Sequence, residues 1–228
     1  MPRLRSLALP AVAAVLTLAG GDAQQGFSAS LMGYRARWTS TDQVPQRLID
    51  GGLFGRFDSL DASDGGSTSR SSLSGEWHRN VGGAVSKVSA YAMRYRLELY
   101  SNFTYALERP DSGDQFAQKD SRSVYGLQAS HAFGHSLAGL PLRTEFGVQV
   151  RHDRIRVGLF DTAQRQTLAT TREDDVRQTL LGVYGQSTVE VSPILRAVLG
   201  LRADRLTTRV DALTLAYNSG RASATQLS

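Results

Sequence analysis

The sequence predicts an all-β chain folded as an antiparallel transmembrane β-barrel of the outer-membrane type, incomplete, with about seven or eight strands of a larger barrel. Three observations support this fold class. Strand after strand shows period-two alternation, and short turns alternate with long polar loops. After the N-terminal segment, no apolar run reaches the length of about 18 residues that a spanning helix needs.

The composition excludes several functional classes. Cysteine is absent, so neither disulfides nor thiolate chemistry are available. The net charge is +5, but the basic residues, nearly all arginine, are scattered along the chain. Without a basic block or a patch interleaved with aromatic residues, we expect no nucleic-acid partner. The mean hydropathy of −0.26 is compatible with a barrel, whose lipid-facing and lumen-facing residues average to a polar value.

Residues 1–25 allow two interpretations. A short basic start, an apolar stretch from Ser6 to Gly20 and small residues up to Ala23 fit a secretory signal peptide. Alternatively, Ala14 to Ala19 is the first barrel strand, followed by a turn at Gly20–Asp22 and a second strand from Phe27. The segment is too short for a spanning helix in either case.

The clearest strand is predicted from Val85 to Leu99. Its odd positions include Tyr91, Met93, Tyr95, Leu97 and Leu99, whereas its even positions include Ala90, Arg94, Arg96 and Glu98. Successive side chains of a strand point to opposite faces, so one face is apolar and aromatic and the other is small or charged.

Two later segments repeat this alternation. Leu142 to Val150 sets Phe146 and Val148 against Arg143 and Glu145, and Leu195 to Ala203 sets leucine and alanine against Arg196 and Arg202. The face dense in charged and amide side chains favours a wet lumen over the alternative of a soluble β-sandwich. Aromatic residues near strand ends fit an interfacial girdle: Trp38, Trp77, Tyr100, Phe103, Tyr105 and Tyr125.

The connections differ in length from one to the next. Turn residues at 80–83, 139–141 and 192–193 predict short turns. Residues 39–69, 108–119, 161–173 and 217–224 are predicted to be longer polar loops, with one short helix at Val44 to Asp50. Short turns on one side and long loops on the other are typical of outer-membrane barrels.

Six arginines are candidates to line the lumen: Arg94, Arg96, Arg143, Arg151, Arg196 and Arg202. The alternative for each is that it only solvates the lumen and pairs with an acidic residue such as Glu98, Glu145 or Asp204.

The sequence predicts no catalytic, cofactor-binding or metal-binding residues. His131 and His135 share one face of a strand but are too far apart there for one ion. Asp58, Asp61 and Asp64 lack the spacing of a calcium-binding loop, which favours a solvated loop.

Several stretches resemble the barrel of TonB-dependent outer-membrane receptors. They are Trp38 to Arg47 with Gly55–Phe57 and Asp64–Gly66, then Leu99 to Tyr105 with Gly113–Phe116 and Lys119–Arg122, and finally Leu199 to Arg205. These are patterns of barrel strands and loops rather than catalytic motifs. On this interpretation residues 26–228 are part of a receptor barrel.

The resemblance implies active uptake of a scarce nutrient, such as a metal chelate, across the bacterial outer membrane, with outer-membrane lipid as a partner and no enzymatic activity or cofactor. In the family a plug domain couples a 22-stranded barrel to the TonB complex. No plug precedes Phe27 and the last residues resemble an unpartnered strand, so we expect a fragment that does not transport alone. The alternative is a small self-contained outer-membrane barrel acting as an enzyme or a passive structural protein.

Overall fold

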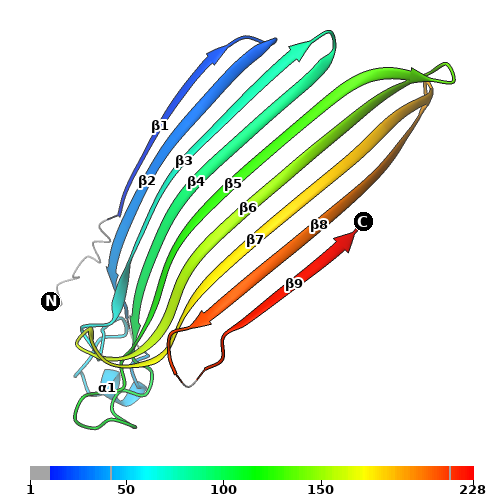
Figure 1. Cartoon of the computed structure of the whole chain (residues 1–228). Coiled ribbons are helices and arrows are strands. Elements are labelled where there is room, and N and C mark those ends of the chain that lie inside the picture. Colours follow the sequence, from blue (N-terminus) through cyan, green and yellow to red (C-terminus); the bar gives the residue numbers. More distant parts are fainter. Residues whose placement is uncertain (1–10, 42, 216) are drawn as a thin grey trace.

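The computed structural model describes residues 11–41, 43–215 and 217–228. Within them a single antiparallel sheet of nine strands dominates, each strand hydrogen-bonded to the next along the chain (Figure 1). The strands are β1 (Ala11–Gly21), β2 (Gln25–Thr39), β3 (Gly65–Val81), β4 (Ala84–Ser101), β5 (Phe116–Leu137), β6 (Leu140–Ala163), β7 (Gln166–Ser192), β8 (Leu195–Ala212) and β9 (Gly220–Leu227). The predicted all-β antiparallel architecture is confirmed, with slightly more strands than expected.

The connections divide between the two ends of the sheet. β1–β2, β3–β4, β5–β6 and β7–β8 are joined by short turns at one end, and the longer connections lie at the other (Figure 1). Gly82 and Gly83 have φ of 58° and 81°, and Ala138 and Gly139 have 53° and 79°. Two consecutive positive φ angles give a turn whose twist matches that of the flanking strands.

The prediction of a long loop at residues 161–173 is wrong. β6 continues to Ala163 and β7 begins at Gln166, so only Gln164 and Arg165 form the turn. Their φ angles of 49° and 65° repeat the geometry of the glycine-containing turns. Because neither residue is glycine, the sequence gives no sign of this turn. The segment is polar on both faces, so it lacks the alternation that signals a strand, yet its backbone pairing continues with two register shifts.

The predicted short helix is present as α1 (Gln46–Asp50), in the β2–β3 connection directly after Pro45. No helix in the described part of the chain is long and apolar enough to cross a membrane.

At the N-terminal end, β1 pairs with β2 along its full length, from Ala11 opposite Ala36 to Gly21 opposite Gly26. Residues 1–10, where the basic start of a signal peptide would fall, lie outside the described residues.

The registers sort the side chains onto two faces, because directly opposite residues of paired strands point to the same side. We call one side the apolar face. In its half nearest the short turns, large apolar side chains follow one another across the sheet: Phe27, Leu31, Leu73, Trp77, Leu127, Val150, Leu181, Val183, Leu199 and Leu201. Many of them are exposed, Leu73 by 55% and Leu199 by 70%. A water-facing sheet would not present such a surface.

The opposite side, which we call the polar face, carries amide and charged side chains at the same level: Glu76, Gln128, Glu145, Gln149, Arg151 and Asp204. β5, β6 and β7 are 22, 24 and 27 residues long. A tilted strand needs only about 9–11 residues to span a bilayer, so these strands extend well beyond it toward the loops.

Candidate functional site

The arginines of the polar face are mostly neutralised by a carboxylate two residues away on the same strand, where side chains point to the same side. On β8, Arg202 Nε lies 2.6 Å from Asp204 Oδ2, and its Nη2 also donates to Gln149 Oε1 at 2.9 Å. Three further pairs follow the same spacing: Arg151 with Asp153, Arg172 with Asp174, and Arg122 with Asp120.

The structure separates the six predicted lumen arginines into two groups. Arg143, Arg151, Arg196 and Arg202 belong to the polar face, as the registers of β6, β7 and β8 show. Arg94 and Arg96 lie on the other side. Arg94 is opposite Ser71 and Ser123, in the same set of alternate positions as the apolar Leu73 and Leu127.

The six therefore cannot all line one lumen, and the expectation is corrected for Arg94 and Arg96. The reason lies in β4, where the apolar residues change sides along the strand. Ala90 and Ala92 belong to the apolar face near the short turns, whereas Tyr95, Leu97 and Leu99 lie on the polar face near the loops. Alternation within one strand fixes which residues share a face but not which face is which.

A ladder of alternating tyrosine and arginine on the polar face near the loop end was not predicted from the sequence. Tyr34 on β2 lies opposite Arg70 on β3, which lies opposite Tyr95 on β4, which lies opposite Arg122 on β5. Arg122 Cζ stands 5.9 Å from the centre of the Tyr95 ring. The four residues are far apart in the sequence, so only the strand register brings them together.

Arg70 differs from Arg122 in its surroundings. Within the described residues its side chain makes no ion pair and no hydrogen bond, whereas Arg122 pairs with Asp120. A guanidinium without a carboxylate, set between two phenol rings, can bind an anion by paired N–H donors and an aromatic ligand by stacking.

The connections at the loop end are tied together by Gln115, whose side chain is 1% exposed. Its Nε2 donates to Ser63 Oγ at 2.7 Å and to Asp64 Oδ1 at 2.9 Å, both in the β2–β3 connection. Its Oε1 accepts from the Arg165 backbone N–H at 2.9 Å in the β6–β7 turn. One amide thus joins three connections and fixes them above the polar face.

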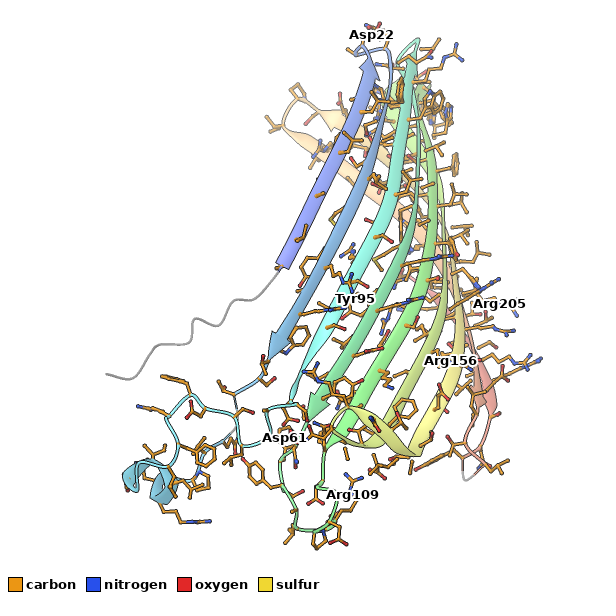
Figure 2. The ribbon with its side chains drawn as sticks, turned by 90° about the vertical axis from the view of Figure 1, so that its left-hand side faces the viewer. Asp22, Asp61, Tyr95, Arg109, Arg156 and Arg205 are labelled. Carbon is orange, nitrogen blue, oxygen red and sulfur yellow. The ribbon has the colours of Figure 1, made fainter. Side chains whose placement is uncertain are left out.

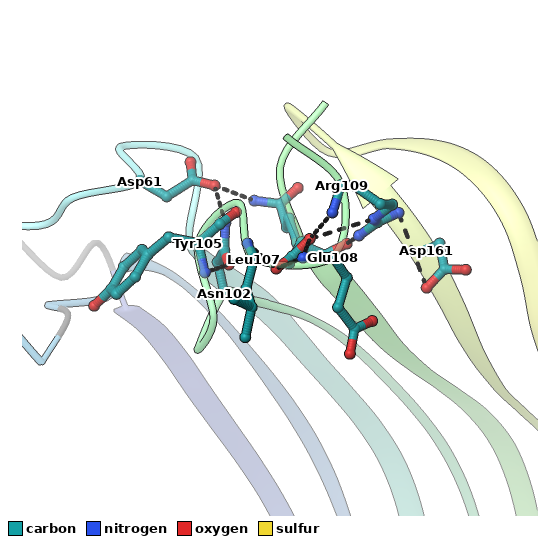
Figure 3. A network of polar contacts seen from close by, with 9 residues as sticks. Asp61, Asn102, Tyr105, Leu107, Glu108, Arg109 and Asp161 are labelled. Atoms are coloured by element: carbon teal, nitrogen blue, oxygen red, sulfur yellow. Dashed lines mark hydrogen bonds and ion pairs between the residues drawn. The ribbon is translucent and has the colours of Figure 1, made fainter. Parts of the chain in front are cut away.

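The β4–β5 connection is shaped by two further side chains (Figure 3). Asn102 Oδ1 accepts from the Tyr105 backbone N–H at 2.8 Å, which stabilises the positive φ of 62° at Tyr105. Asp114 accepts backbone N–H bonds from Leu107 at 2.8 Å and from Arg109 at 2.7 Å. The carboxylate acts as the centre of a tight loop.

These hydrogen bonds shift acid equilibria in the loops. Burial alone would raise the pKa of Asp114, but the backbone N–H groups of Glu108, Arg109 and Leu107 and the Thr104 hydroxyl together bring this pKa below its usual value. The pKa of Asp61 is also lowered, because hydrogen bonds from Ser63 and Asn102 outweigh the effect of burial.

The residues discounted as metal ligands have other partners. His131 bonds to Ser86 and His135 to Thr144, with the Phe133 ring between the two imidazoles. Asp58 accepts from the Gly55 backbone N–H. In the described ranges, no group of three or more histidine, aspartate or glutamate side chains could hold a metal ion.

The chain is similar in sequence to one protein family and in fold to several solved structures. The family described as TonB dependent receptor-like, β-barrel, matches residues 15–228. The unliganded ferric citrate transporter FecA matches with a TM-score of 0.71 at 11% identity, over 96% of this chain and 33% of that one. The ferric-catecholate import receptor Fiu from E. coli K12, in its open form, matches with a TM-score of 0.67 at 7% identity, over 95% and 43%.

The ferripyoverdine receptor of Pseudomonas aeruginosa matches with a TM-score of 0.59 at 14% identity, over 95% of this chain and 32% of that one. At such identities the likeness concerns the fold alone. The chain spans about a third to two fifths of the length of these structures. No curated protein matches its sequence.

Proposed function

This chain belongs to the TonB-dependent receptor family through its β-barrel, and we propose that it forms part of the wall of a barrel that imports a ferric chelate. Membership identifies it as a receptor and transport protein of the bacterial outer membrane rather than an enzyme. The identity of the ligand, and the coupling of its import to the TonB complex, are part of this proposal.

In this proposal the polar face is the lumen and the apolar face meets lipid. The exposed leucines support the assignment, because a barrel turns an apolar band outward and polar side chains inward. Arg143, Arg151, Arg196 and Arg202 then line the path, and the paired aspartates of Arg151 and Arg202 moderate their charge.

The observation that carries the ligand class is Arg70 between Tyr34 and Tyr95. A ferric chelate presents anionic oxygens, which an unpaired guanidinium binds well, and aromatic rings can cover its less polar surfaces. The names of the similar structures agree with this chemistry, since they are a ferric citrate transporter, a ferric-catecholate import receptor and a ferripyoverdine receptor.

The test is to titrate ferric citrate, and separately ferric dihydroxybenzoate, into the full chain in dodecyl maltoside micelles while recording tryptophan fluorescence. Trp38 is suited as the reporter because it lies on the polar face, opposite Gly66. We expect saturable quenching by at least one chelate, and a loss of affinity of about tenfold or more in Arg70→Gln.

Arg79→Gln is the matched control, because Arg79 is on the same strand but lies on the apolar face, near the short turns. Equal affinity of Arg70→Gln and the unchanged chain would contradict the role of Arg70. Absence of quenching by both chelates would contradict the ligand class.

A further inference from the structure

A belt of arginines crosses the apolar face immediately on the loop side of its apolar rows. One register row runs through Gly33, Ser71, Arg94, Ser123, Arg154, Arg177 and Arg209. The next row adds Arg35, Arg96 and Arg156. Arg156 of this belt and Arg205, which lies on the same face, project outward from the curved sheet in Figure 2.

The part of the belt on β2 and β4 is not neutralised. In the described chain, the side chains of Arg35, Arg94 and Arg96 form no ion pair and no hydrogen bond. On the same face, Arg156 meets Glu173 and Asp175 at 3.4 and 3.2 Å, and Arg209 meets Asp211 at 2.8 Å. Three exposed positive charges therefore stand together without forming an ion pair within the described residues, and Glu98, two residues from Arg96 on the same face, is not paired with them either.

These three arginines border a hollow of about 630 Å³. Its floor is made by small residues, among them Gly33, Ser69 and Ser71. A Cβ added at Gly33 would meet no atom within 4 Å, so the space above the strand is open. Positively charged walls around a floor of small side chains leave room for a compact anionic group.

The surface just below the hollow is apolar. Two residues from Arg94 toward the short turns lies Ala92, opposite Leu73, which is opposite Leu31. Two residues of a strand span about 7 Å, so the guanidinium groups stand roughly one headgroup layer above exposed leucines. This is the relative placement of phosphate and acyl chain in a membrane lipid.

We propose that Arg35, Arg94 and Arg96 bind the phosphate of a lipid headgroup in the leaflet facing the long loops, with the acyl chains lying along Leu31 and Leu73. Guanidinium groups bind phosphate by paired N–H donors. The occupant is a phosphorylated lipid rather than a free anion because the charged hollow and the exposed leucines form one continuous surface.

The test measures binding of fluorescently labelled lipid A that carries its two phosphates to the full chain in dodecyl maltoside micelles, by fluorescence anisotropy. The same lipid without phosphates and free inorganic phosphate are the comparison ligands. We expect the phosphorylated lipid to bind more tightly than the phosphate-free lipid. Arg94→Gln/Arg96→Gln should weaken it about 30-fold, at about fivefold per arginine near an anionic surface.

The charge-matched control is Arg47→Gln/Arg56→Gln, which removes two exposed arginines of the β2–β3 connection. Retained affinity in this control supports a local site. An equal loss in both double variants, or equal affinity for the phosphate-free lipid, would overturn the proposal. Competition by inorganic phosphate at the same concentration as the lipid would also overturn it, because it would indicate a site for free anions.

Discussion

The ring of Tyr184 fills the space in which a side chain of Gly147 would stand. The two residues lie directly opposite each other on β7 and β6, and a Cβ on Gly147 would overlap the tyrosine ring. The Tyr184 hydroxyl donates to Glu145 Oε1 at 2.7 Å. Tyr91 covers Gly126 in the same way on β4 and β5, also on the polar face. An aromatic ring laid over a cross-strand glycine shields backbone that would otherwise be bare.

Gly147→Ala should therefore destabilise the chain. The added methyl group displaces the Tyr184 ring and strains its bond to Glu145, at a cost of roughly 1–3 kcal/mol in the free energy of unfolding. Urea unfolding in micelles measures this cost. Gly33→Ala is the matched control, because a Cβ there meets nothing within 4 Å. Equal stability of the two variants would contradict the close approach of Tyr184 and Gly147.

Arg202 and Asp204 should stabilise the sheet as a pair. Two N–H groups of Arg202 reach the two carboxylate oxygens of Asp204 at 2.6 and 2.7 Å. In a double-mutant cycle of Arg202→Gln and Asp204→Asn, we expect a favourable coupling energy between the two side chains.

The matching cycle for Arg156 and Asp175, which are joined at 3.2 Å and more exposed, should give a smaller coupling energy. If the coupling energy of Arg156 and Asp175 equalled that of Arg202 and Asp204, the two parallel hydrogen bonds of Arg202 would add no stability.

The β4–β5 connection should become disordered in acid. The pKa of Asp114 is lower in the folded chain than in the unfolded one, because backbone N–H groups stabilise its carboxylate against the effect of burial. Its stabilising contribution is thus complete above the ordinary aspartate pKa of about 3.9 and is lost as the pH falls through the lowered value. Amide hydrogen exchange at Leu107 and Arg109, corrected for the intrinsic pH dependence, reports this loss.

The variant Asp114→Ala should show the fast exchange at neutral pH, whereas Asp111→Ala, a change at an exposed residue of the same connection, should not. Protection of both amides in Asp114→Ala would contradict the role of the carboxylate.

Much of the fold could be predicted from periodicity and turn chemistry. The alternation at Leu142–Val150 and Leu195–Ala203 predicts both the strands and the grouping of their side chains. The β6–β7 hairpin could not be predicted, because Gln164 and Arg165 form its turn without glycine and its strands are polar on both sides.

The candidate site was less predictable than the fold. Arg94 and Arg96 alternate correctly within β4, but their side of the barrel depends on their pairing with Ser71, Ser69, Ser123 and Ser121. The ladder of Tyr34, Arg70, Tyr95 and Arg122 depends on the registers of three strand pairs at once. The sequence around each residue does not specify its neighbours on other strands. The side on which Arg94 and Arg96 lie and the tyrosine–arginine ladder are therefore visible only in the folded sheet.

The assignment of the two faces supports every functional proposal, and the two tryptophans test it most directly. Trp77 lies on the apolar face, between Phe27 and Val88. Trp38 lies on the polar face near the loop end, opposite Gly66. The measurement is fluorescence of the single-tryptophan chains Trp38→Phe and Trp77→Phe in vesicles of lipids brominated on their acyl chains. We expect strong quenching of Trp77 by the bromolipid and quenching of Trp38 by aqueous iodide only. Bromolipid quenching of Trp38 with protection of Trp77 would reverse the two faces and contradict the account.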